Sequence, residues 1–257
     1  MKKLNEVLKE LKEIGHYIID TENKVVITRE QLGEMISSDY DEAIECLDND
    51  LFLEAFMVAD KPMLTVLQDL QARFDQSERI LFHLQYELAP NLQFSYRDVI
   101  YRDVASLGNA ILEDRAEKAV IMEAMRYKMI SFYARYKKLD EARVDIVNRL
   151  DFAENYMEKD PEIAYLLVGH LLTDRVYYTY NGRKFKSIIT LYSYLNDKKK
   201  MMAFSKTMED DVRFKAWLFY LGFADTYDKW KQRIKEIDYE DFQAVYPDTK
   251  EKLKIKD

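Results

Sequence analysis

Short runs of β-branched and aromatic residues recur three times along the chain, each interrupted by a polar turn. The first run covers residues 17–27, with residues 21–24 as its turn. The second covers residues 92–101, with its turn at residues 97–98, and the third covers residues 176–185, with its turn at Asn181 and Gly182. Asn-Gly between β-prone residues is a strong hairpin signal, because both turn positions favour a positive φ. The pattern therefore predicts three β-hairpins.

Each predicted hairpin is followed directly by the pattern of a helix start. Thr28, Asp103 and Ser187 stand at the three candidate N-cap positions, where a side-chain oxygen accepts hydrogen bonds from the first helical turn. Behind each cap, two apolar residues one helical turn apart predict a buried stripe. The three pairs are Leu32 and Ile36, Leu107 and Ile111, and Leu191 and Leu195. Hairpin, cap and stripe recur together, which predicts a repeated structural unit.

The remaining segments have the apolar spacing of amphipathic helices. We expect an N-terminal helix within residues 1–15 and long helices over residues 64–88 and 142–172. Residues 47–56 also align with residues 208–217. This alignment makes Phe56 and Trp217 equivalent positions, and we expect both to face the core.

These elements predict a mainly α protein of about three tandem units, each a β-hairpin followed by helices. The units cover residues 17–91, 92–175 and 176–245, and residues 250–257 form a charged tail. No linker rich in Pro, Gly or Ser interrupts the chain, so we expect a single continuous domain over residues 1–257. The predicted architecture is a short solenoid or a stack of helical repeats. With 6 Gly and 4 Pro, the chain has too few turn residues for a many-stranded sandwich or barrel.

The single cysteine and the apolar runs limit the cellular context. Cys46 has no second cysteine with which to form an internal disulfide, and the carboxylates around it disfavour a thiolate, so we expect a packing residue. No apolar run approaches the ~20 residues of a membrane span. Charged residues interrupt the N-terminal apolar positions, so we expect no signal peptide and a cytoplasmic location.

Charge is distributed unevenly along a chain of formal net charge −8. An acidic set lies between residues 30 and 60, where no Lys or Arg occurs, and a basic set surrounds the third predicted hairpin and the end of its helix. One interpretation is two solvated faces; the other is two interaction surfaces of opposite sign. The acidic set is Glu34, Asp39, Asp41, Glu42, Glu45, Asp48, Asp50 and Glu54. The basic set is Arg183, Lys184, Lys186, Lys198, Lys199 and Lys200, with Tyr178 and Tyr180 on the adjoining strand.

Residues with catalytic or metal-binding chemistry form no known motif. His83 and His170 lie on apolar helical segments and His16 stands alone, so none has the spacing of a zinc site. Nucleophile-elbow, phosphate-loop and dinucleotide patterns all need residues that this chain does not have in the required order. We therefore predict no cofactor, no metal and no enzymatic activity.

The sequence favours a non-enzymatic protein-binding function, as an adaptor, a regulator or an inhibitor. The expected partner is another protein or a second copy of this chain, met through the charged surfaces. One alternative is a nucleic-acid-associated protein that uses the basic third hairpin and its tyrosines, or one whose acidic first unit mimics nucleic acid. A third is an enzyme whose site is assembled only in space.

Overall fold

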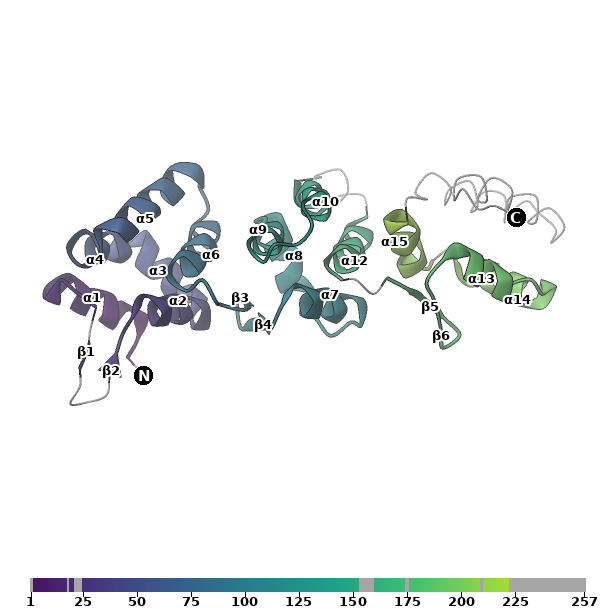
Figure 1. The fold of residues 1–257 in the computed structure, drawn as a ribbon, viewed down its shortest axis with the longest axis horizontal. Coiled ribbons are helices and arrows are strands. Elements are labelled where there is room, and N and C mark those ends of the chain that lie inside the picture. Colours follow the sequence, from purple (N-terminus) through teal and green to yellow (C-terminus); the bar gives the residue numbers. More distant parts are fainter. Residues whose placement is uncertain are drawn as a thin grey trace. The chain divides into compact units, whose positions relative to one another are not determined.

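The computed structural model describes residues 2–17, 19–20, 25–152, 160–173, 176–208 and 210–221. Within these residues the chain is mainly helical, with fourteen helices and three antiparallel pairs of short strands (Figure 1). The predicted fold class is therefore confirmed at the level of a mainly α protein. The chain divides into two compact units, residues 1–152 and residues 153–257. The single continuous domain and the solenoid-like stacking stay predictions.

Unit 1, residues 1–152, contains ten helices and four strands in its described part. Its strands are β1 (Ile19–Asp20), β2 (Val25–Val26), β3 (Phe94–Tyr96) and β4 (Val99–Tyr101). Its helices are α1 (Leu4–Ile14), α2 (Arg29–Ser38), α3 (Tyr40–Asp48), α4 (Leu51–Ala59), α5 (Lys61–Arg73), α6 (Ser77–Leu88), α7 (Val104–Leu112), α8 (Lys118–Arg126), α9 (Met129–Tyr136) and α10 (Glu141–Phe152).

Unit 2, residues 153–257, is described from residue 160 to residue 221 with short gaps. Its strands are β5 (Tyr178–Tyr180) and β6 (Arg183–Phe185). Its helices are α12 (Pro161–Leu172), α13 (Ile188–Tyr194), α14 (Lys198–Met208) and α15 (Val212–Tyr220). The predicted charged tail and the end of the third predicted unit lie outside the described residues.

The three predicted strand pairs are present with one common register. The outer pairs are Ile19 with Val26, Phe94 with Tyr101, and Tyr178 with Phe185. The second and third hairpins turn through two residues of positive φ, Arg97 and Asp98 in one and Asn181 and Gly182 in the other. This is the type I′ geometry that matches the twist of a hairpin. The predicted turn at residues 21–24 lies outside the described residues.

The three predicted helix caps are confirmed at the atomic level. Each cap stands two residues after the last residue of its hairpin's second strand. The side chains of Thr28, Asp103 and Ser187 accept a hydrogen bond from the backbone N–H three residues later, and each site is a complete capping box. The predicted apolar stripes behind the caps are buried, with at most 2% of any side chain exposed. Local sequence therefore fixes each transition from hairpin to helix.

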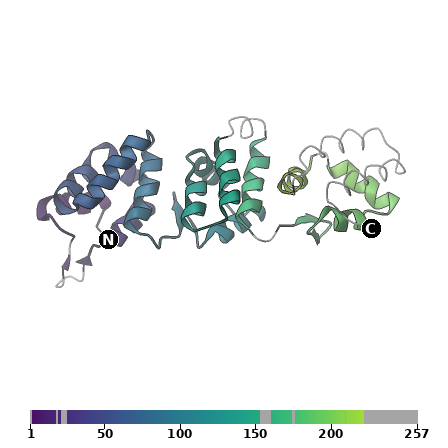
Figure 2. The same cartoon turned by 45° about the horizontal axis from the view of Figure 1, so that its top comes forward.

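A helix that precedes a hairpin packs against the third helix that follows it. In unit 1, α1 packs on α4, and in unit 2, α12 packs on α15 (Figure 1). Between them in sequence, α6 meets α9 through aromatic rings, with Phe132 centred 6.0 Å from Phe82 and 5.9 Å from Tyr86. The helices α8, α9 and α10, teal in Figure 2, pack against one another. The hairpin, the capped helix and the next helix thus connect two helices that pack against each other.

Both predicted long helices are wrong, because each contains a break. Residues 64–88 belong to two helices, and Phe74 between them has an extended backbone (φ −130°, ψ 135°). The Phe74 backbone therefore leaves the helix, and its side chain packs against Arg79 and His83 of α6. In the segment 142–172, α12 begins at Pro161 after Asp160, whose φ of −145° and ψ of 66° are not helical. Proline disfavours helical backbone in the residue before it.

Replacing Asp103 with Ala should lower the free energy of unfolding by about 1 kcal/mol, because the N–H of Ser106 loses the Asp103 oxygen that it now meets at 2.7 Å. Urea denaturation followed by circular dichroism measures the change. Asp103→Asn keeps an acceptor at the cap and serves as the control. Equal losses in both variants would contradict the capping explanation.

Replacing Trp217 with Ala should lower the free energy of unfolding by about 3–5 kcal/mol, because a fully buried indole is removed from the core of unit 2. The predicted inward orientation of Phe56 and Trp217 is confirmed, since both are fully buried. Trp217→Phe is the matched control and should cost less, because it keeps a ring and removes an indole N–H that has no hydrogen-bond partner among the described residues. A thermal unfolding midpoint unchanged by Trp217→Ala would refute this role.

Candidate functional site

The aromatic core of unit 2 fixes the third hairpin to α15. Tyr178 on β5 stacks on Trp217, with ring centroids 5.6 Å apart, and its ring also contacts Phe214 at 5.1 Å. The Tyr178 hydroxyl donates a hydrogen bond to Asp211 at 2.5 Å, and Asp211 in turn caps α15. Burial and this hydrogen bond raise the pKa of the Tyr178 hydroxyl well above its ordinary value. Tyr178 is therefore an anchor for the hairpin.

A shallow, open groove of about 670 Å³ lies where β6, α13 and α14 meet. Its cations are Arg183 and Lys184 from β6 and Lys200 from α14. Phe185, which is buried, and Tyr194, which is half-buried, supply its aromatic surface, and their rings lie 5.4 Å apart. The remaining lining residues are Thr190 and Ser193 of α13. We call this site the basic groove.

Two cations of the basic groove converge on one aromatic ring. The guanidinium carbon of Arg183 lies 4.9 Å from the centroid of Tyr194, and the Lys200 ammonium lies 4.8 Å from it. Lys184 lies 4.2 Å from the centroid of Tyr177 and donates a hydrogen bond to its hydroxyl at 3.0 Å. Cation–π contacts orient such side chains without neutralising their charge. In the described part of the chain, none of these three cations forms an ion pair.

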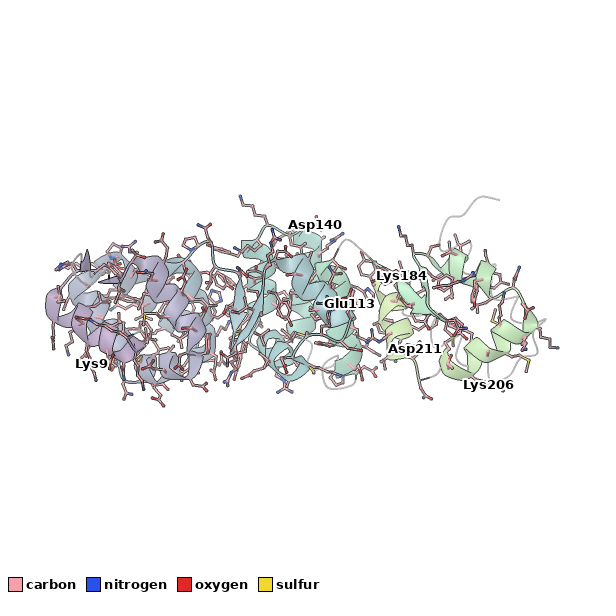
Figure 3. All side chains as sticks on the ribbon, turned by 90° about the horizontal axis from the view of Figure 1, so that it is seen from below. Lys9, Glu113, Asp140, Lys184, Lys206 and Asp211 are labelled. Carbon is pink, nitrogen blue, oxygen red and sulfur yellow. The ribbon has the colours of Figure 1, made fainter. Side chains whose placement is uncertain are left out.

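The structure separates the predicted basic set into groove and non-groove residues. Arg183, Lys184 and Lys200 line the groove, whereas Lys186, Lys198 and Lys199 do not. Lys184 is labelled on the hairpin in Figure 3, together with Lys206 on α14. Tyr180 is half-buried, with its ring 5.0 Å from Phe204.

Tyr178 does not belong to the predicted interaction surface. Only 4% of it is exposed, because its ring is used for packing against α15. The groove residues on α13 were not predicted from the sequence. They lie between the two basic clusters, residues 183–186 and 198–200. Their position beside the cations depends on the contact between α13 and β6, which no local sequence pattern encodes.

Most of the predicted acidic set makes contacts within unit 1. Asp39 caps α3, and Glu42 accepts a hydrogen bond from the N–H of Leu4 at 3.2 Å. Other pairs join Asp48 to Ser77 at 2.7 Å, Glu54 to Lys12 at 2.9 Å and Asp41 to Arg97 at 3.5 Å. Asp39, Asp41 and Asp48 stay exposed despite these contacts, and Glu34, Glu45 and Asp50 are exposed as well. The acidic set therefore contributes to caps and helix contacts, which makes it a weaker candidate for binding than the basic groove.

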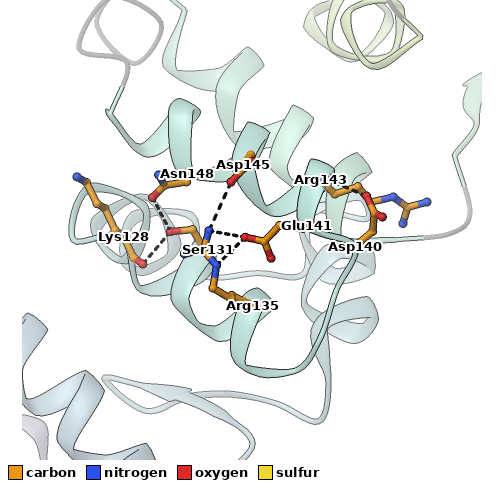
Figure 4. Close-up of polar contacts among 8 residues, drawn as sticks. All are labelled: Lys128, Ser131, Arg135, Asp140, Glu141, Arg143, Asp145 and Asn148. Atoms are coloured by element: carbon orange, nitrogen blue, oxygen red, sulfur yellow. Dashed lines mark hydrogen bonds and ion pairs between the residues drawn. The ribbon is translucent and has the colours of Figure 1, made fainter.

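A second polar cluster joins α9 to α10 on the surface of unit 1 (Figure 4). Arg135 contacts Glu141 at 2.9 Å and Asp145 at 3.4 Å, and Ser131 lies 3.4 Å from Asn148. Its charges are paired with one another and about half exposed. This cluster links two neighbouring helices, and pairs of this kind contribute little to stability at a surface.

The residues whose side chains could act as nucleophile or base are wholly or partly buried. Cys46 is buried, as predicted, and burial together with Glu42 and Glu45 raises the pKa of its thiol to about 11. His83 is half-buried, with its ring tilted against Phe132 at a centroid distance of 3.8 Å, and the buried His170 lies 5.7 Å from Tyr220. Burial, with Arg79 near His83 and Arg213 near His170, lowers the pKa of each imidazole to about 4. Among the described residues, no group of three or more His, Cys, Asp or Glu side chains is arranged to hold a metal ion.

Comparisons with protein-family models, with curated proteins and with solved structures find no match for this chain. None of the helices in the described ranges combines the length and the apolar character that crossing a membrane requires.

Stability should fall as the pH falls from 6.5 to 4, because His83 and His170 stay neutral in the folded chain but take up protons in the unfolded chain. The unfolded state binds more protons in this window, so the free energy of unfolding rises with pH, by about 3 kcal/mol per histidine. Urea denaturation of His83→Gln and His170→Gln at several pH values measures the effect. Each variant should show a shallower dependence than the parent, and an unchanged slope would contradict the assignment.

Proposed function

We propose that this chain is a non-enzymatic binding protein that contacts an acidic surface or segment of a partner protein through the basic groove. One observation carries the proposal: Arg183, Lys184 and Lys200 come from two separate elements, surround one groove and form no ion pair in the described residues. Clustered cations of this kind raise the association rate of an acidic partner and favour it over basic ones. Arginine and tyrosine are also the side chains that contribute most at protein interfaces.

The recurrence of a helix, a hairpin and a capped helix supports a wider proposal about architecture. Three units of this kind would stack as helical repeats and present extended surfaces to a partner. Such a protein would act as an adaptor, a regulator or an inhibitor in the cytoplasm, as the sequence suggests.

The alternative partners are less well supported. A second copy of this chain would offer the acidic set of unit 1, but most of those carboxylates already make intramolecular contacts, and the same contacts weaken the nucleic-acid-mimic reading. Single-stranded nucleic acid stacks its bases on free aromatic faces. In the third hairpin, Tyr178 is buried, Lys184 lies over Tyr177, and two cations lie over Tyr194.

Charge reversal in the basic groove should abolish capture of an acidic partner. The full chain, the groove variant (R183E, K184E, K200E) and a control variant (K186E, K199E, K206E) are immobilised and exposed to cell lysate. All six residues are exposed, and the two variants change the net charge equally. We expect the parent and the control variant to capture the same protein in stoichiometric amount, with binding that weakens as salt rises, and the groove variant to lose it.

Two results would overturn the proposal. Equal loss in both variants would mean that overall charge, and not the groove, mediates the contact. Capture that survives in the groove variant would place the interface elsewhere. Material that absorbs at 260 nm and elutes steeply with salt would support the nucleic-acid alternative instead.

A further inference from the structure

We propose that the basic groove recognises a phosphomonoester on a phosphorylated side chain of the partner protein. This inference rests on the proposed function, because it names the acidic group that the groove binds. It follows from the convergence of Arg183 and Lys200 on Tyr194, from the hydroxyl groups beside them, and from the carboxylate of Asp197 next to Lys200.

Arg183 and Lys200 bring two positive charges close together. Arg183 and Lys200 lie 4.9 and 4.8 Å from one ring centroid, so their charges are within about 10 Å of each other. Neither has an ionic partner among the described residues, so the two charges repel each other across the groove. A single dianion that contacts both cations offsets this repulsion. A phosphomonoester supplies a charge of roughly −1.5 to −2 in one group, whereas a carboxylate supplies −1.

The groove also presents hydrogen-bond donors that suit the oxygens of a phosphate. Arg183 presents a planar fork of N–H donors that matches two oxygens of a phosphate, and Lys200 adds a mobile point charge. Thr190 and Ser193 lie three positions apart on α13, so their side chains share the helix face that lines the groove. The Thr190 hydroxyl donates to the Ser187 carbonyl at 2.8 Å, and the exposed Ser193 is placed to donate to a bound phosphate.

A carboxylate next to Lys200 disfavours an extended polyanion. Asp197 accepts hydrogen bonds from the N–H groups of Lys199 and Lys200 at 2.9 and 3.1 Å, so the N-terminus of α14 already has a negative charge of its own. A polyanion that runs past Lys200 would meet this charge, whereas a single phosphate needs to contact only Arg183 and Lys200.

Binding of degenerate peptide libraries to the full chain tests the inference. One library has a fixed central phosphoserine, a second has serine at that position and a third has glutamate. Fluorescence anisotropy should show the phosphoserine library binding about tenfold more tightly than the glutamate library, and inorganic phosphate should compete. The pair R183Q and K200Q should remove this preference. The pair K186Q and K199Q removes the same charge outside the groove and should change the affinity by less than about twofold.

The outcomes separate this inference from the proposed function. Equal affinity for the phosphoserine and glutamate libraries would overturn the phosphate inference and leave an acidic partner in place. A second result has the same meaning. If the parent chain still captures its groove-dependent partner after phosphatase treatment of the lysate, the phosphate inference fails and the acidic partner stays in place. If no library binds and no partner depends on the groove, both proposals fail. Tighter, groove-dependent binding of a single-stranded oligonucleotide would overturn the inference in favour of nucleic acid.

Discussion

The whole structure depends on how its short hairpins are anchored, because two strands of two or three residues are not stable alone in water. In unit 1, Phe94 and Tyr96 of the second hairpin are fully buried against rings of α3, α6 and α9. In unit 2, Tyr178 is held by a ring stack on Trp217 and by its hydrogen bond to Asp211. Ahead of the first hairpin, Tyr17 donates to the buried carboxylate of Asp60 at 2.8 Å. Each hairpin, or the residue ahead of it, thus contacts a segment well beyond it in sequence, and the second hairpin also packs against α3 and α6, which precede it.

This anchoring explains why the basic groove lies on the third hairpin. Because β5 contributes Tyr178 to the core beside α15, the exposed Arg183 of β6 lies next to α13 and α14, whereas Lys184, the next residue, lies over Tyr177. Phe185 and Tyr194 then form an aromatic surface beside which Arg183 and Lys200 lie. The second hairpin has a related position but a different outcome. Its turn cation, Arg97, contacts Glu123 and Asp41 and so has intramolecular partners.

The two long helices were predicted wrongly because the apolar periodicity of residues 64–88 and 142–172 continues across local signals of a helix end. The break after α5 falls at a run of polar residues before Ser77, and the start of α12 falls at Pro161. Both signals are local, so the breaks could have been predicted. The burial of Tyr178 could not, since alternation along β5 does not reveal which face of the hairpin meets a helix. The sequence also could not predict that Asp41, Asp48 and Glu54 contact distant segments of the chain.

By itself, the sequence determined the three strand pairs, the turns of the second and third hairpins and the capped helices that follow, because backbone preferences and N-cap hydrogen bonds act over a few residues. It also determined which apolar positions are buried on these helices. Only the tertiary structure decided which charges remain available for binding. Acidic and basic residues looked equally exposed along the chain, but packing brought partners to most of the former and brought Arg183 and Lys200 to one ring without a counter-charge among the described residues. The difference arises from contacts between segments far apart in sequence, and pattern and propensity carry no information about those.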